Sequence, residues 1–273
     1  MAFNGNDTDI GLPPNGSYLY RFVAPPDERT RTWPLVESPW NVAAVLASYL
    51  LMVRFGPKWA ARYKPMQLRV PLFLHSLAMA LLNAHIFLEL FTASRALGYS
   101  YACQPCRVSY SPHEMRITAA LWWFFISKVF EFADTAFFIL RHKWRQLTFL
   151  HVYHHSSMFF LTWAAARWMP SGSTFLPGMI NSFIHIIMYG YYAASSLGPR
   201  VQRFLWWKRY LTGLQLVQFG YGFIWGAQAL IRKCEVSYWA LITASVYMLP
   251  FLYLFGKFYR KSYGPKAGSK KAM

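Results

Sequence analysis

Long apolar stretches separated by short polar connections dominate this chain. A helix needs about 20 mostly apolar residues to cross a bilayer, and seven stretches approach or reach that length. We therefore predict an all-α polytopic membrane protein with seven transmembrane helices. The predicted spans are Pro39–Val53, Val70–Phe91, Ile117–Leu140, Thr148–Ala166, Phe175–Leu197, Tyr210–Ile231 and Val236–Tyr259.

The composition supports this fold class. Of the 273 residues, 55% are hydrophobic and only 14% are charged, a balance typical of membrane proteins rather than soluble domains. Residues 1–34 are polar and rich in proline and glycine, so we expect no cleavable signal peptide there. We predict a lumenal segment over 1–34, one seven-helix membrane domain over 35–260 and a cytosolic basic tail over 261–273.

The net charge of +18 could suggest a nucleic acid partner, but the distribution of the basic residues indicates topology instead. When seven spans alternate across a bilayer, most lysines and arginines fall in the connections on one side. The positive-inside rule makes that side cytosolic. We therefore expect a cytosolic C-terminus, a lumenal N-terminus and no nucleic acid partner.

Three further features agree with this orientation. The glycosylation sequons, at Asn6 and Asn15, lie in the N-terminal segment. All cysteines fall in connections assigned to the lumenal side, which suits an oxidising compartment. Lys270 and Lys271 form a dilysine retrieval signal near the C-terminus. These features together predict a multi-pass protein of the endoplasmic reticulum membrane.

Polar side chains form stripes inside four of the apolar spans. An ionisable residue in hydrocarbon costs about 2.5 kcal/mol or more, so each needs a partner or a task. One stripe alone could join two helices, but four stripes, each on one helical face, indicate an enclosed polar cavity. The stripes are Lys128, Glu131, Asp134 and Thr135; His151, His154 and His155; Asn181 and His185; and Thr212, Gln215 and Gln218.

The HxxHH pattern of His151–His155 also occurs in membrane di-iron desaturases and hydroxylases. Such a di-iron site needs about eight histidines in several boxes, whereas this chain has one box. A single zinc ion held by His151, His155 and His185 remains an alternative, but we favour metal-free chemistry without a cofactor. A non-enzymatic lipid carrier is a second alternative, although carriers often show internal repeats and none is visible here.

Metal-free imidazoles are suited to acyl transfer. A neutral imidazole can attack a thioester as a nucleophile or accept a proton as a base near neutral pH. A thioester delivered as its CoA derivative would place anionic phosphates at the cytosolic rim. Arg141, Lys143 and Lys208 lie at that rim, next to the ends of the polar spans.

Four ordered motifs make the chain similar to the ELO family of very-long-chain fatty acid elongases. They are KVFEFADT (Lys128–Thr135), QLTFLHVYHH (Gln146–His155), NSFIHIIMYGYY (Asn181–Tyr192) and TGLQLVQF (Thr212–Phe219). The resemblance implies seven helices, six of which enclose an acyl tunnel that is closed toward the lumen. It also implies condensation of an acyl-CoA with malonyl-CoA to a 3-oxoacyl-CoA two carbons longer, with release of CO2 and CoA.

The resemblance assigns the catalytic roles to the histidine cluster. His154 would be the nucleophile that forms an acyl-imidazole. His151 and His185 would line the thioester and stabilise developing charge, while His155 and Asp134 would support their orientation. An alternative role for Asp134, and for Glu131, is a buried ion pair with Lys128.

The resemblance also implies two groups of substrate-binding residues. The pantetheine arm and the reacting carbonyls would contact Lys128, Asn181, Thr212 and Gln215. The nucleotide and phosphates would meet Arg141, Lys143, Gln146, Lys208 and Lys266. Because Gln146 and the LHVYHH sequence resemble members that act on polyunsaturated chains, we expect a polyunsaturated C18–C20 acyl-CoA substrate.

Partners and a disulfide follow from the same resemblance. The expected partners are the lipid bilayer and the ketoreductase, dehydratase and enoyl reductase of the elongation cycle, and a homodimer remains open. Family members commonly have a CQ pair that matches Cys103-Gln104, so we expect a disulfide between Cys103 and Cys234. A bridge from Cys103 to Cys106 within CQPC is the alternative.

Overall fold

A computed structural model describes residues 26–236 and 238–264 of the chain, and within these residues the regular secondary structure is entirely helical. The all-α class is therefore confirmed, and each predicted span overlaps one long helix. The long helices are α2 (Pro39–Ala60), α3 (Arg69–Ala96), α4 (Pro112–Leu140), α5 (Phe149–Trp168), α6 (Phe175–Ser196), α8 (Lys208–Ile231) and α9 (Tyr238–Tyr263). Shorter elements are η1 (Trp144–Gln146), η2 (Gly172–Thr174) and α7 (Pro199–Gln202).

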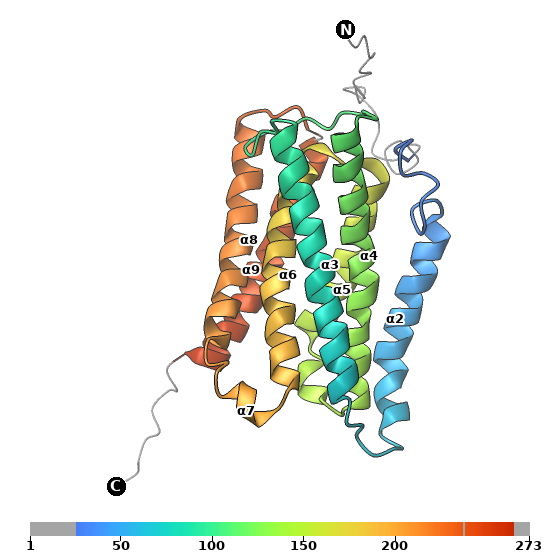
Figure 1. The fold of residues 1–273 in the computed structure, drawn as a ribbon, viewed down its shortest axis with the longest axis vertical. Coiled ribbons are helices and arrows are strands. Elements are labelled where there is room, and N and C mark those ends of the chain that lie inside the picture. The colour runs from blue at the N-terminus through green and yellow to red at the C-terminus, as the bar shows by residue number, and fades with distance from the viewer. Residues whose placement is uncertain (1–25, 237, 265–273) are drawn as a thin grey trace.

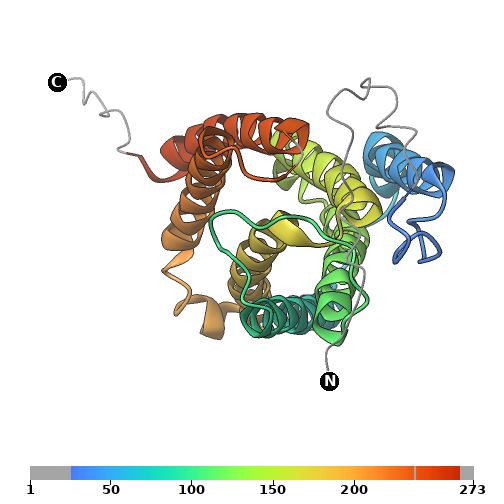
Figure 2. The same ribbon diagram turned by 90° about the horizontal axis from the view of Figure 1, so that it is seen from above.

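The long helices run side by side along one axis (Figure 1). Seen from above, α4, α3, α6, α8, α9 and α5 follow one another around a ring, and α2 lies outside it (Figure 2). A hydrogen bond of 2.7 Å between the Ser157 and Tyr247 hydroxyls joins α5 to α9 and closes the ring. The Tyr49 ring of α2 stacks on Phe132 of α4 with ring centroids 4.1 Å apart, which holds α2 against the outside.

Capping residues set where the helices that carry the polar stripes begin. The Ser111 side chain accepts a hydrogen bond from the Glu114 backbone N–H, and Pro112 occupies the first turn of α4. Thr148 accepts from the backbone N–H of His151 at 3.2 Å. This cap starts α5 directly before the histidines and thereby sets the direction in which their face points.

Several helices are longer than the predicted spans. α2 continues past the predicted end at Val53 to Ala60, and α4 begins at Pro112 rather than at Ile117. The predictions ended where charged or polar residues interrupt the apolar run. Such residues end an apolar stretch without ending a helix, because a helix can continue beyond the hydrocarbon with its polar side chains in water.

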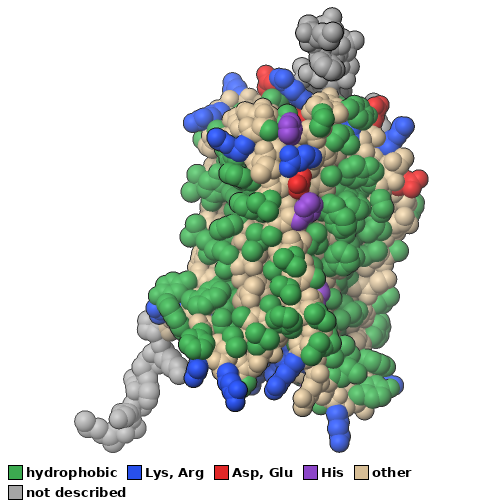
Figure 3. All heavy atoms as spheres, in the orientation of Figure 1, with side chains coloured by type: hydrophobic (Ala, Val, Ile, Leu, Met, Phe, Trp, Pro, Cys, Tyr) green, Lys and Arg blue, Asp and Glu red, His purple; other side chains and the backbone are tan. Residues whose placement is uncertain are grey.

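The outer surface of the bundle is apolar over its middle. Hydrophobic side chains cover the middle of the face in Figure 3, and lysines and arginines gather toward its two ends. Leu81 of α3 is 62% exposed, and Val217 and Ile224 of α8 are 67% and 66% exposed. Soluble monomers rarely expose apolar areas of this extent, so the surface favours contact with lipid.

Two helices in the described chain are long and apolar enough to cross a membrane by length and composition. They are Arg69–Ala96, with a mean hydropathy of 1.6, and Ala240–Tyr263, with a mean hydropathy of 1.4. The polar stripes and flanking charges of the other long helices lower their hydropathy. Crossing of a membrane by all seven therefore remains a prediction.

A disulfide joins two connections at the upper end of the bundle in Figure 1, which is the end that carries the α3–α4 and α8–α9 connections. Cys103 and Cys234 form this bridge, with Cα atoms 5.6 Å apart, and Cys106 is a free thiol. The predicted pairing is confirmed. A cross-link between residues so far apart in the chain can contribute about 3–5 kcal/mol before strain is counted.

The upper end also contains a buried ion pair from the segment that precedes α2. The Arg29 guanidinium lies 2.8 Å from the Asp27 carboxylate, and both side chains are fully buried. Arg29 also donates to the Ser171 hydroxyl at 3.1 Å, next to the Cys106 thiol, whose pKa is raised by burial. These contacts attach the start of the described chain to the connection between α5 and α6.

Some predicted features lie outside the described residues. They are the sequons at Asn6 and Asn15, the phosphate contact at Lys266 and the dilysine signal at Lys270 and Lys271. They stay predictions, as do the boundaries drawn at residues 34 and 260.

Candidate active site

The polar stripes of α4, α5 and α6 meet inside the bundle. Lys128 and Glu131 of α4 are each 1% exposed, and His185 of α6 is 4% exposed. His155 of α5 is also buried. The prediction that separate stripes converge is confirmed for these three helices.

Glu131 lies at the centre of this cluster. Its Oε1 accepts a hydrogen bond from the Lys128 ammonium at 2.7 Å and lies 3.5 Å from His185 Nε2. Its Oε2 lies 3.8 Å from His155 Nδ1. The ion pair considered for Lys128 and Glu131 is therefore present, and it is also part of the histidine site. Sequence reasoning did not include Glu131 among the site residues, although its three-residue offset from Lys128 was the available signal.

A contact with the backbone determines the tautomer of His185. His185 Nδ1 lies 2.9 Å from the carbonyl oxygen of Asn181. A carbonyl can only accept, so Nδ1 donates, and a neutral ring then presents Nε2 without a proton. The Asn181 side chain is also engaged, because its Oδ1 accepts from the Lys128 ammonium at 3.3 Å. The predicted substrate residues Lys128 and Asn181 are thus in direct contact with each other.

His154 presents a ring nitrogen without a partner. Its Nδ1 is buried and has no hydrogen-bond partner among the described residues. The ring packs edge-on against Phe251 of α9, with centroids 5.3 Å apart, and lies 5.4 Å from the His155 ring. Buried polar atoms are nearly always hydrogen-bonded, so this nitrogen is available to an incoming group.

His151 is held by a hydroxyl pair from α4 and α2. His151 Nε2 and Thr135 Oγ1 are 2.7 Å apart, and the Tyr49 hydroxyl is 3.3 Å from the same Thr135 oxygen. The His151 and His155 ring centroids are 4.3 Å apart. The three histidines of α5 therefore form one continuous group. His151 is the member that the contact with the Thr135 hydroxyl holds in place.

The close contacts of Asp134 are with Tyr189 of α6 and His75 of α3. Its Oδ2 accepts from the Tyr189 hydroxyl at 2.7 Å, and its Oδ1 lies 3.3 Å from His75 Nε2. His75 of α3 stood alone in the sequence, where nothing indicated this contact. The described contacts of Asp134 orient Tyr189, one turn beyond His185, and the expected support of the histidines remains a prediction.

The other expected substrate residues lie toward the lower end of the bundle or on α8. Gln215 donates to the Met188 sulfur at 3.5 Å, which places it next to α6, and Thr212 is buried. The α4–α5 connection and the start of α8 contain the remaining described residues of this set, namely Arg141, Lys143, Gln146 and Lys208. Both segments lie at the lower end of the bundle in Figure 1.

One group in the cluster has the donor types of a zinc site. Ligand atoms of Glu131, His154 and His185 lie within 4.8 Å of one another, and two imidazoles with a carboxylate can bind zinc. This trio differs from the one considered from the sequence, since Glu131 and His154 take the places of His151 and His155. The Lys128 ammonium already contacts the Glu131 carboxylate at 2.7 Å, so a metal cation would have to compete with a fixed positive charge.

Comparisons with known proteins agree on one family. The chain is 47% identical over 251 residues to human "very long chain fatty acid elongase 4", covering 90% of this chain and 80% of that protein. It is 39% identical over 255 residues to mouse "very long chain fatty acid elongase 2", covering 93% and 87%. It is 37% identical over 254 residues to Xenopus tropicalis "very long chain fatty acid elongase 5", covering 93% and 85%.

The family profile described as "GNS1/SUR4 family" matches residues 34–272. That match includes all the long helices and every described residue of the histidine cluster. The chain therefore belongs to the ELO family.

Proposed function

We propose that this protein is a very long chain fatty acid elongase that condenses an acyl-CoA with malonyl-CoA. The observation that carries the proposal is the buried cluster in which a ring nitrogen of His154 lies within 4.8 Å of ligand atoms of Glu131 and His185. The Nδ1 of His154 has no hydrogen-bond partner among the described residues. Relatives named as elongases over nearly the whole chain support the same function.

In the first half-reaction, a ring nitrogen of His154 attacks the thioester carbonyl. The bond between carbon and sulfur breaks, an acyl-imidazole forms, and the CoA thiolate leaves with the proton that the imidazole loses. The buried site excludes water, which protects the acyl-imidazole from hydrolysis. His185, whose Nε2 lies 3.5 Å from Glu131 Oε1 in the same cluster, is placed to relay that proton.

In the second half-reaction, malonyl-CoA loses CO2 and becomes an enolate. Its carbon attacks the acyl carbonyl, a carbon–carbon bond forms, and the bond from the carbonyl carbon to the His154 nitrogen breaks. The departing ring takes up one proton from solvent, which replaces the proton that left with CoA. Negative charge develops on carbonyl oxygens in both half-reactions, and fixed donors that face such charge contribute strongly to catalysis. Lys128 is the cation of the cluster. We assign it this role, with Asn181, Thr212 and Gln215 holding the pantetheine arm.

The proposal also includes an orientation of the protein in the membrane. We place all seven long helices across the endoplasmic reticulum membrane, with the upper end of Figure 1 in the lumen and the lower end in the cytosol. The apolar outer surface and the disulfide at the upper end support this orientation. The six helices of the ring would enclose an acyl tunnel closed toward the lumen, and CoA would remain at the cytosolic end.

We further propose a polyunsaturated C18–C20 acyl-CoA as substrate, because Gln146 and the LHVYHH sequence resemble members with that preference. A 3-oxoacyl-CoA product must be reduced, dehydrated and reduced again before another round. A ketoreductase, a dehydratase and an enoyl reductase are therefore the expected functional partners. A homodimer remains an open prediction.

Release of labelled CO2 tests the proposed reaction. We expect purified protein to release 14CO2 from carboxyl-labelled malonyl-CoA, and to form a 3-oxoacyl-CoA detectable by mass spectrometry, when acyl-CoA is present. A panel of acyl-CoAs in the same assay measures the chain preference. A lipid carrier would release no CO2, and a desaturase would yield an unsaturated product of unchanged length.

Replacement of His154 tests the covalent step. After incubation with acyl-CoA alone, the intact mass of the wild-type protein should increase by one acyl group. His154→Ala should lack this adduct and lose condensation by a factor of about 10³ or more, since a nucleophile is removed. His113→Ala, at an exposed histidine at the start of α4, is the control. An adduct that persists in His154→Ala would place the nucleophile elsewhere, with His185 as the first candidate.

Metal removal tests whether the cluster acts through imidazoles alone. We expect activity to survive purification in a strong chelator, and elemental analysis to find no stoichiometric zinc or iron in the active protein. The reason is the Lys128 ammonium, which already neutralises Glu131. Loss of activity on chelation, restored by a single metal, would refute the metal-free mechanism.

A further inference from the structure

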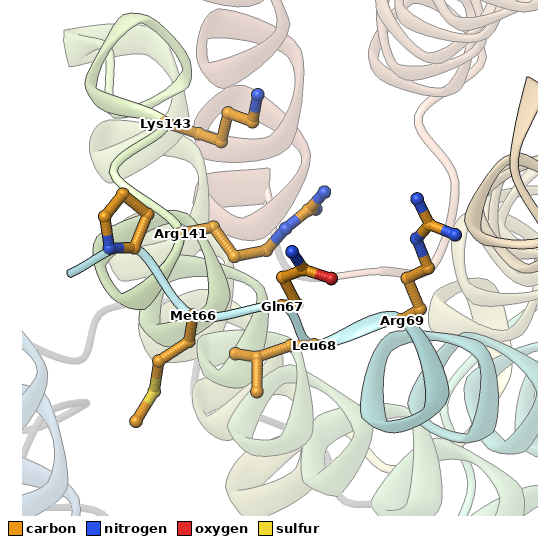
Figure 4. Close-up of a pocket in the computed structure, with 7 residues that line it drawn as sticks. Met66, Gln67, Leu68, Arg69, Arg141 and Lys143 are labelled. Atoms are coloured by element: carbon orange, nitrogen blue, oxygen red, sulfur yellow. The ribbon is translucent and has the colours of Figure 1, made fainter.

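Pockets at opposite ends of the bundle differ in charge. The pocket at the lower end, of about 310 Å³, has Arg69 beside Arg141 and Lys143, two residues already expected to meet the phosphates of CoA (Figure 4). We call it the basic pocket. A pocket of about 350 Å³ lies near the α3–α4 connection at the upper end, and we call it the upper groove. Its lining includes Trp33, His85, Glu89, Arg116 and Trp123, and so contains both a carboxylate and a guanidinium.

The upper groove lies on the outside of the bundle, between α3 and α4. His85 and Glu89 are one turn apart on α3, and Arg116 and Trp123 are two turns apart on α4, so each wall is one face of a helix. Figure 3 shows acidic, basic and histidine side chains that interrupt the apolar surface near its upper end, over α3 and α4. Ionisable groups at a lipid-facing position are rare and need a task there.

An ion pair joins the two walls of the groove. Arg116 Nε donates to Glu89 Oε2 at 2.7 Å, and Arg116 Nη2 donates to Glu89 Oε1 at 3.2 Å. The same Nη2 donates to the Thr92 hydroxyl at 2.8 Å. The Arg116 and Glu89 side chains are 38% and 26% exposed. Part of each charged group therefore faces outward, although the pair is fixed in orientation.

Both members of the pair can bind a further group. The described contact of Arg116 Nη1 is the exposed His113 ring, whose Nδ1 lies 3.4 Å away, and a phosphate oxygen is a stronger acceptor for a guanidinium. Each Glu89 oxygen accepts one hydrogen bond from Arg116. A carboxylate oxygen has two lone pairs, so one on each oxygen can accept from an ammonium group. The groove thus presents a site for an anion beside a site for a cation.

Two tryptophans supply the aromatic part of the groove. Trp33 belongs to the segment before α2, and its ring meets the Trp122 ring edge-on with centroids 5.7 Å apart. Trp122 Nε1 donates to the carbonyl of Pro34 at 3.1 Å, which holds this segment against α4. Trp123 is 36% exposed. Indole rings attract ammonium groups, quaternary ones included, and tryptophan is typical of the membrane–water interface.

We propose that the upper groove binds the headgroup of a zwitterionic phospholipid in the lumenal leaflet. The phosphate would lie at Arg116, and the ammonium group at Glu89 and the tryptophan rings. The charges are complementary, because ion pair and headgroup each have one positive and one negative group. An anionic lipid would instead add net negative charge beside Glu89. The leaflet rests on the proposed orientation of the bundle, whereas the binding chemistry does not depend on elongase activity.

Lipid binding to purified full-length protein in detergent tests the groove. Native mass spectrometry follows titration with dioctanoyl phosphatidylcholine, or with dioctanoyl phosphatidylglycerol, which has the same chains and a phosphate but no ammonium group. We expect the wild-type protein to bind phosphatidylcholine about fivefold or more tighter than phosphatidylglycerol.

Removal of the ion pair should abolish this preference. Glu89→Gln/Arg116→Gln replaces both charges by amides and should weaken phosphatidylcholine binding about tenfold or more, since charge-assisted hydrogen bonds are lost. Arg95→Gln, at an exposed arginine in the last turn of α3, is the matched control and should leave the affinity unchanged. Trp123→Leu keeps the ion pair and should weaken phosphatidylcholine binding about threefold or more, with little effect on phosphatidylglycerol.

Three results would overturn the site. Equal affinity of the wild-type protein for the two lipids, unchanged in the double variant, would mean adventitious lipid only. A preference for phosphatidylglycerol that is lost with Arg116 would mean an anion site instead. A preference for phosphatidylcholine that both the double variant and Trp123→Leu retain would place the lipid elsewhere on the protein.

Folding and activity are controlled separately. The melting temperature without lipid reports folding, and if the double variant does not fold, the result with Trp123→Leu decides. Condensing activity is assayed in the same preparations. Selective lipid binding by a protein without condensing activity would keep the groove and refute the proposed function. Full condensing activity without selective lipid binding would do the opposite.

Discussion

The ion pair between Lys128 and Glu131 is the interaction on which the interior depends. Both side chains are almost fully buried, and charges without partners in such surroundings are strongly destabilising. Glu131 is shared with His155 and His185, and Lys128 is shared with Asn181. α4, α5 and α6 must therefore keep one register, because a rotation of any of them would leave a charge without its partners.

The surfaces of the protein differ in the side chains that they expose. The outer face is apolar and suited to lipid, whereas the polar groups lie inside or at the ends (Figure 3). The upper end is tied by the Cys103–Cys234 disulfide and the buried Asp27–Arg29 pair. The lower end has the basic pocket and the start of α8. The disulfide and the buried ion pair both lie at the upper end, so the two ends of the bundle differ in how their described connections are held together.

Hydropathy and helical periodicity predicted which residues share a face, and so found the stripes of α4, α5 and α6. The resemblance to the ELO family predicted the disulfide. Contacts between helices were harder to predict, because they depend on how each helix is rotated and how far it slides along its neighbour. Glu131 as the centre of the cluster, His75 beside Asp134, and Arg69 beside Arg141 are of this kind. In each case the partners lie on different helices or connections, and no spacing along the chain encodes their approach.

A comparison of Lys128→Met, Glu131→Leu and the double variant tests most directly the claim that the ion pair serves both folding and condensation. Each single change leaves a buried charge without its partner, at a cost of about 3–5 kcal/mol, so both single variants should unfold at clearly lower temperature than the wild-type protein. The double variant replaces the pair by apolar side chains, and it should regain most of the lost thermal stability while showing no condensation. Wild-type activity in the double variant, or single variants as stable as the wild type, would contradict this account.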